Sequence, residues 1–104
     1  MNAKLIYVTV PSREEAEKIA TAAVTERLAA CANILDGVTS IFHWDDKLCR
    51  EDEAILIFKT AAIRTEELVV RIKHLHPYKC PCITVLPIEG GAPAFLQWIE
   101  QETA

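Results

Sequence analysis

Residues 31–60 read CANILDGVTSIFHWDDKLCREDEAILIFKT and predict a long β-hairpin. The first arm (31–44) is rich in β-branched and aromatic residues, and the second (47–60) ends in the apolar run AILIF. DDK (45–47) predicts the turn, and DG (36–37) predicts a bulge or bend in the first arm. A usual strand has about five or six residues. Arms this long would overhang the core of a 104-residue chain, so we expect a neighbouring chain to cover the overhang.

Strand and helix signals alternate on both sides of this hairpin. LIYVTV (5–10) is a continuous apolar run that predicts a buried strand. Ser12 and Glu15 have the spacing of a capping box, so a helix is expected to begin there. Residues 61–75 predict a second helix, which Pro77 ends because proline cannot continue it.

The last third of the chain completes the pattern. CITVLP (82–87) predicts a short strand, and Pro93 fits the first turn of a final helix. The predicted order is therefore β-α-β-β-α-β followed by a helix. This order indicates an α+β, ferredoxin-like sandwich, with residues 1–104 forming a single domain.

Composition and charge favour an oligomer and argue against nucleic-acid-binding and membrane-spanning proteins. The chain is 51% hydrophobic, and so short a domain would leave apolar surface outside a monomer core, which favours an oligomer. The net charge is −4 with scattered basic residues, so we expect no nucleic-acid partner. No stretch approaches the roughly 20 apolar residues of a membrane span. The beginning of the chain lacks signal-peptide features, so we expect a cytoplasmic protein with reduced cysteines.

A candidate metal site lies in HPYKCPC (76–82). Thiolates and imidazole suit Cu(I) and Zn(II), so His76, Cys80 and Cys82 are candidate ligands. Alternatively, the segment is a helix-to-strand turn that binds nothing. The C-x-C spacing differs from the C-x₂₋₄-C spacing of closed zinc sites. Both interpretations remain open at this point.

A second candidate site is a cleft between subunits. Lys59 ends the AILIFK run and could pair with Glu89 or hold an anion. Tyr78, Trp44 and Trp98 would edge the same pocket, since aromatic residues are favoured at interfaces. The plainer interpretations are structural ion pairing for Lys59 and interface packing for Trp44.

A further acidic group combines EDE (51–53) in the second arm of the hairpin with Asp45 and Asp46 at the turn. Clustered carboxylates bind hard divalent ions weakly. We expect this group to be a solvated face.

Seven segments, in this order and at these spacings, form a highly specific pattern: VTVPSREEAEKIA (8–20), ERLAACANIL (26–35), VTSIFHWDDK (38–47), IFKT (57–60), LHPYKCP (75–81), LPIEGG (86–91) and FLQWI (95–99). The chain thereby resembles the CutA family of divalent-ion tolerance proteins over about residues 5–100. The resemblance implies a ferredoxin-like fold and a tight homotrimer similar to the signalling protein PII. It also implies a role in tolerance of copper and other divalent metals.

The copper-binding pattern of the best-known bacterial member carries over only in part. That pattern has a cysteine just before the T-x-P end of the first strand, where this chain has Val8. It also has two adjacent histidines before Pro-Tyr, where this chain has Leu75 and His76. One ligand of three matches, so a copper site of that design is not expected here.

The sequence favours a protein without catalytic activity. It contains no G-x-S-x-G, no P-loop and no H-E-x-x-H. Three hypotheses follow: a homotrimer that responds to divalent metal ions by weak binding or signalling, a dedicated copper or zinc binder, and a trimer that scaffolds an unknown partner protein. We expect no required cofactor, with copper or another divalent ion as the candidate ligand.

Overall fold

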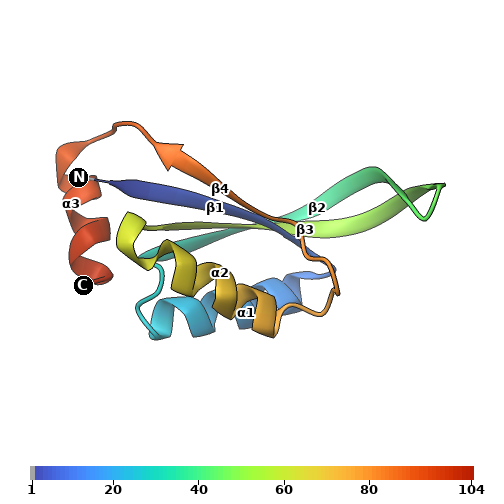
Figure 1. The fold of residues 1–104 in the computed structure, drawn as a ribbon, viewed down its shortest axis with the longest axis horizontal. Helices are drawn as coiled ribbons and strands as arrows, with labels where there is room; N and C mark the ends of the chain where they lie inside the picture. Colours follow the sequence, from blue (N-terminus) through green and yellow to red (C-terminus); the bar gives the residue numbers. More distant parts are fainter. Residues whose placement is uncertain (1) are drawn as a thin grey trace.

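The computed structural model describes residues 2–104 and has four strands and three α-helices. Their bounds are β1 (Ala3–Val10), α1 (Arg13–Thr25), β2 (Cys31–Trp44), β3 (Lys47–Ala61), α2 (Thr65–Leu75), β4 (Ile83–Ile88) and α3 (Pro93–Glu102). The strands form one antiparallel sheet in the order β2-β3-β1-β4. Helices α1 and α2 lie side by side on one face of this sheet, and α3 lies at one end (Figure 1). The predicted α+β, ferredoxin-like fold is confirmed.

Strand β1 begins two residues before its predicted start, β4 is shifted by one residue, and the largest difference is the start of the second helix. Strand β3 continues through Ala61, and a short 3₁₀ turn, Ala62–Arg64, precedes α2. The first helix begins as expected, because the side chain of Ser12 accepts a 3.2 Å hydrogen bond from the Glu15 N–H.

The core lies between the sheet and the two covering helices. Alternate residues of a strand point to the same face, and the apolar residues of β1 and β3 that point toward the helices are fully buried. Small residues of α1 pack against them, which lets the helix approach the sheet closely. The core residues from these three elements are Ile6, Val8, Val10, Ala16, Ile19, Ala20, Ala23, Ala54, Leu56 and Phe58.

The opposite face of the sheet is largely uncovered in a single chain. Leu5, Tyr7 and Ile57 on this face are only half-buried, and Leu86 on β4 is exposed. Helix α3 covers only the end of this face, where Ile99 packs in a small cluster with Ala3 and Ala30. Much apolar surface of the sheet therefore faces solvent in the isolated chain.

The β2–β3 hairpin extends well beyond the helices (Figure 1). The chain measures 44 × 24 × 22 Å because of this extension. The register shifts between Leu35 and Val38, which confirms the predicted irregularity at Asp36 and Gly37. Gly37 has a φ of 70°, and its N–H donates a 3.0 Å hydrogen bond to Asp36 Oδ1. The bulge marks the point beyond which the hairpin leaves the core.

The distal half of the hairpin carries exposed apolar side chains among its polar residues. Ile41 is 68% exposed, Leu48 is 71% exposed and Trp44 is 55% exposed. Asp45 and Asp46 connect the strands with φ angles of 52° and 60°. Two central residues with positive φ are typical of a type I′ turn, which matches the twist of a hairpin.

Helix α1 ends in a Schellman motif around a non-glycine residue. The Arg27 N–H donates to the Val24 carbonyl, and the Leu28 N–H donates to the Ala23 carbonyl, each at 3.0 Å. Arg27 has a φ of 61°, in the left-handed region where glycine is usual. Its guanidinium lies 3.2 Å from Glu102 Oε1 at the end of α3.

Candidate functional site

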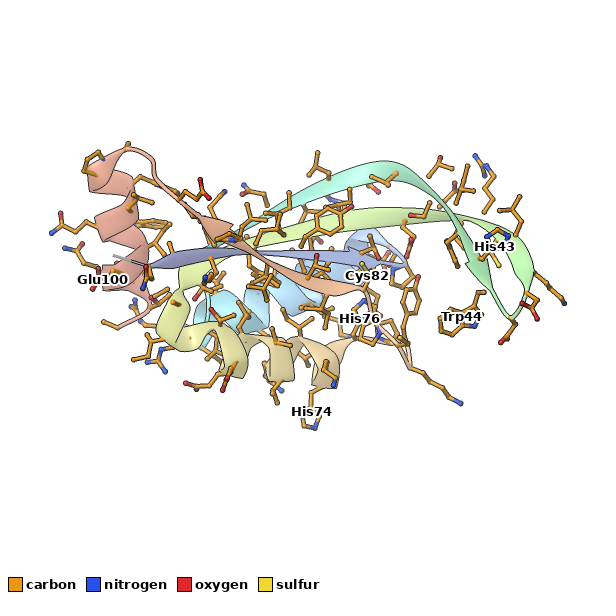
Figure 2. The ribbon with its side chains drawn as sticks, turned by 45° about the horizontal axis from the view of Figure 1, so that its top comes forward. His43, Trp44, His74, His76, Cys82 and Glu100 are labelled. Atoms are coloured by element: carbon orange, nitrogen blue, oxygen red, sulfur yellow. The ribbon has the colours of Figure 1, made fainter. Side chains whose placement is uncertain are left out.

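The candidate metal loop, residues 76–82, connects α2 to β4 and is anchored at its start. His76 follows the last residue of α2, and its N–H donates a 2.9 Å hydrogen bond to the Ile72 carbonyl. Pro77 then prevents the helix from continuing. The His76 side chain points toward the end of β1, and the residue is only 7% exposed. Figure 2 shows His76 close to the sheet, whereas His74 points away from it beyond α2.

Both ring nitrogens of His76 are engaged within the protein. Nε2 lies 2.8 Å from the Thr9 carbonyl oxygen at the end of β1. Nδ1 accepts a 3.1 Å hydrogen bond from the Tyr78 N–H. Because a carbonyl only accepts, Nε2 carries the proton, and because Nδ1 accepts, it carries none. This network assigns the neutral Nε2–H tautomer and leaves no free lone pair for a metal ion.

Tyr78 anchors the loop a second time. Its hydroxyl donates a 2.9 Å hydrogen bond to Glu53 Oε2 on β3. Its ring packs against that of His76, with centroids 4.8 Å apart and planes tilted by 51°. Glu53 is only 8% exposed, so the tyrosine hydroxyl stabilises a carboxylate that is largely removed from water. The expectation of a solvated acidic face is therefore wrong for Glu53, although Glu51 and Asp52 are exposed.

This environment also changes the acidity of Tyr78. Partial burial, the hydrogen bond to Glu53 and the negative charges of Glu53 and Glu51 raise the pKa of Tyr78 to about 12. Burial is the largest of these effects, since it disfavours the charged phenolate. Tyr78 is therefore a neutral hydrogen-bond donor at physiological pH.

Cys80 and Cys82 lie on the exposed part of the loop and carry free thiols. Their surroundings differ from that of His76, which is turned inward. Within residues 2–104, no group of three or more His, Cys, Asp and Glu side chains is arranged to hold a metal ion. A single chain thus presents the two cysteines at the surface without His76 as a third ligand.

The copper pattern of the best-known bacterial relative does not fit this structure. Val8 is fully buried in the core, and Leu75 is a half-buried apolar residue that packs against the core cluster. His76, the matching position, already uses both nitrogens. These three positions offer no open ligand.

The five residues proposed for an inter-subunit cleft are spread over one chain. Lys59 Nζ donates a 2.6 Å hydrogen bond to Asn33 Oδ1, and no ion pair to Glu89 occurs within the described part of the chain. Trp44 lies at the hairpin tip (Figure 2), whereas Trp98 stacks on Phe95 in α3, with centroids 5.7 Å apart. A pocket that contains all five would need more than one copy of the chain.

The sequence did not pair His76, Lys59 and Tyr78 with the residues that they contact. Thr9, Asn33 and Glu53 have no local motif that marks them, because their partners lie 67, 26 and 25 residues away in the chain.

No helix among residues 2–104 is long and apolar enough to cross a membrane.

Comparison with known proteins gives a consistent result. A family model described as "CutA1 divalent ion tolerance protein" matches residues 4–102. The Divalent-cation tolerance protein CutA of Thermus thermophilus is 43% identical over 100 residues, covering 96% of this chain and 97% of that protein. Protein CutA, chloroplastic, of Arabidopsis thaliana is 39% identical over 95% of this chain, which spans 54% of the plant protein.

Solved structures agree with the sequence matches. The crystal structure of CutA from Xylella fastidiosa superposes with a TM-score of 0.97 at 35% identity and covers 100% of both chains. The Thermus thermophilus Cut A1 structure gives a TM-score of 0.95 at 42% identity, covering 98% of this chain and 99% of that one.

Proposed function

This chain belongs to the CutA1 family of divalent ion tolerance proteins, and on that premise we propose that it acts in the tolerance of divalent metal ions, copper among them, without catalysing a reaction. The observation that carries the proposal is the family match over residues 4–102. The names of the relatives place those proteins in divalent-cation tolerance. The described residues add buried anchors and exposed thiols at the candidate loop.

The working form proposed is a homotrimer similar to PII. Its support is the open face of the sheet, where Leu5, Tyr7 and Ile57 are half-buried, together with the exposed apolar side chains of the distal hairpin. Apolar patches of this kind mark association surfaces. Native mass spectrometry of the full chain should give three times the mass of one chain. A stable monomer at micromolar concentration would contradict the trimer.

A cytoplasmic location is part of the proposal. Its support is that the four cysteines are unpaired, which suits a reducing compartment. Family members differ in this respect, because the Arabidopsis relative is named as chloroplastic. Cell fractionation with a compartment marker tests the location.

The function is tested by growth. Deletion of the gene should increase sensitivity to copper in the medium, and the full chain should restore growth. Parallel plates with zinc and cobalt show whether tolerance extends to other divalent ions. Unchanged growth of the deletion strain with all three metals would contradict a role in tolerance.

The exposed hairpin tip favours one alternative, a trimer that scaffolds a partner protein. Trp44 and Leu48 are apolar and exposed there, and interfaces are enriched in aromatic residues. The alternative predicts that Trp44→Ala abolishes partner capture but leaves the trimer intact. It also predicts that metal tolerance depends on that partner.

A further inference from the structure

We infer that Cys80 and Cys82 form a two-thiolate site for a soft monovalent ion, Cu(I), with no histidine ligand. This inference deepens the proposed function, on which it rests for its biological meaning, by naming the ion and its ligands.

The local backbone favours convergence of the two thiols. Cys80 and Cys82 are separated only by Pro81, and β4 begins directly afterwards at Ile83. The residue before a proline is restricted to extended conformations, and proline itself has a fixed φ. Side chains two residues apart in an extended segment point to the same side. The two thiols are therefore expected on one face of the loop.

The dimensions are compatible with one bridging ion. Two residues of extended chain span at most about 7 Å between their Cα atoms. Metal–sulfur bonds of about 2.3 Å let one ion join sulfurs that are about 4.6 Å apart. A cysteine side chain can close the remaining gap by a rotamer change. Both thiols are exposed and free, so binding requires no opening of the core.

The pair lies between two fixed points of the fold. On one side, Tyr78 is held to β3 through Glu53, and His76 is held to β1 through Thr9. On the other side, Ile83 pairs with Val8 in the sheet. Only a few residues separate these anchors, so the two cysteines lose little freedom when they bind an ion. Preorganisation of this kind increases affinity.

The ligand set selects the ion. Zinc in structural sites takes four ligands in tetrahedral geometry, and the described residues offer no third protein ligand near the pair. Thiolates are soft ligands that favour Cu(I). Two thiols and one Cu(I) ion form two sulfur–copper bonds and release two protons, with no change of oxidation state.

The decisive experiment is an anaerobic titration of the reduced full-length protein with Cu(I) in the presence of a chromophoric Cu(I) chelator. We expect one copper per chain and two protons released per copper. Loss of one supporting contact of a metal site costs about 10–100-fold in affinity. Loss of a ligand should cost at least as much, so Cys80→Ser and Cys82→Ser should each weaken binding by roughly a hundredfold or more.

Matched controls come from the same chain. Cys49→Ser removes another thiol that is half-buried in β3 and should leave copper binding unchanged. Zn(II) should not compete at equal concentration. Circular dichroism of each variant verifies that the fold is retained.

Three results would overturn the inference. They are unchanged copper binding in both serine variants, equal loss in Cys49→Ser, and fewer than one copper per chain at saturation, such as one per three chains of a trimer, which would indicate a site shared between chains. The growth assay separates this inference from the proposed function. If Cys80→Ser loses copper in vitro but restores tolerance, the site stands and tolerance works by another route. If binding is absent but tolerance is normal, only the site is wrong.

Discussion

Tyr78 and Glu53 join the loop after α2 to the strand that carries the hairpin, through a 2.9 Å hydrogen bond from the hydroxyl to Oε2. Glu53 lies opposite Val38, immediately beyond the register shift at which the hairpin leaves the core. The bond therefore fixes the candidate loop at the base of the overhanging hairpin.

Tyr78→Phe removes the partner of a largely buried carboxylate. We expect the free energy of unfolding to fall by about 1–3 kcal/mol, because an unsatisfied buried acceptor costs about that much. Chemical denaturation measures the change. Tyr7→Phe is the matched control, since Tyr7 is half-buried and its hydroxyl has no hydrogen bond within residues 2–104. Equal effects of both substitutions would show that the Glu53 contact contributes nothing specific.

The same pair predicts a loss of stability at high pH. The fold raises the pKa of Tyr78 from 10.0 to about 12, so the folded state retains the proton more strongly than the unfolded state. The contribution is complete below pH 10 and is lost as the pH rises to about 12. Wild-type stability should therefore approach that of Tyr78→Phe across this range.

A tyrosine absorbance titration of Glu53→Gln provides the control for this pH dependence. Removing the negative charge should lower the Tyr78 pKa, but burial is the largest cause of the shift. The value should consequently stay above 10.0. A Tyr78 pKa that is identical in wild type and Glu53→Gln would contradict the assigned contact.

Arg27→Gly should stabilise the end of α1. Glycine adopts a positive φ without strain, which favours it over a side chain by roughly 1 kcal/mol at such a position. The substitution also removes the exposed ion pair with Glu102, which contributes about 0–1 kcal/mol. Arg27→Ala loses the ion pair but keeps the strain. Thermal unfolding should therefore rank glycine above alanine by about 1 kcal/mol, and the reverse order would refute the strained backbone.

Asp46→Gly should stabilise the hairpin turn locally. Type I′ turns favour glycine because both central residues have positive φ, and Asp46 has a φ of 60°. We expect amide hydrogen exchange near Trp44 and Lys47 to slow by a few-fold, corresponding to about 0.5–1 kcal/mol. Asp46→Ala should speed exchange instead. Global stability should change little, because the tip lies outside the core.

The fold was predictable because its signals are local. The apolar run at 5–10 and the N-cap at Ser12 depend on neighbouring residues alone; the run lies within β1, and Ser12 caps α1 as predicted. The bulge at Gly37 was likewise visible in its Asp-Gly pair. Each of these signals depends on backbone preference or periodicity, which a single sequence contains.

The candidate site was only partly predictable, because its contacts depend on strand register. His76 was named as a candidate metal ligand from its residue type, yet its Nε2 lies 2.8 Å from the carbonyl oxygen of Thr9 on β1. Glu53 was grouped with exposed acids, yet it meets Tyr78. These contacts depend on which residues of β1 and β3 the tertiary fold brings next to the loop, and no local sequence pattern encodes that.

The overhang of the β2–β3 hairpin places the two tryptophans of the chain far apart, because Trp44 ends β2 at the tip and Trp98 lies in α3. Trp44 lies at the hairpin tip, where only a neighbouring molecule could shield it, and Trp98 lies on α3 at the far end of the chain. Trp98 stacks on Phe95 within its own chain, so its fluorescence should include a phase that follows folding of the individual subunit, with a rate independent of concentration. Fluorescence from Trp44 should follow subunit encounter, with a rate that rises with concentration. Single-tryptophan variants would thus separate the unimolecular and bimolecular steps of assembly.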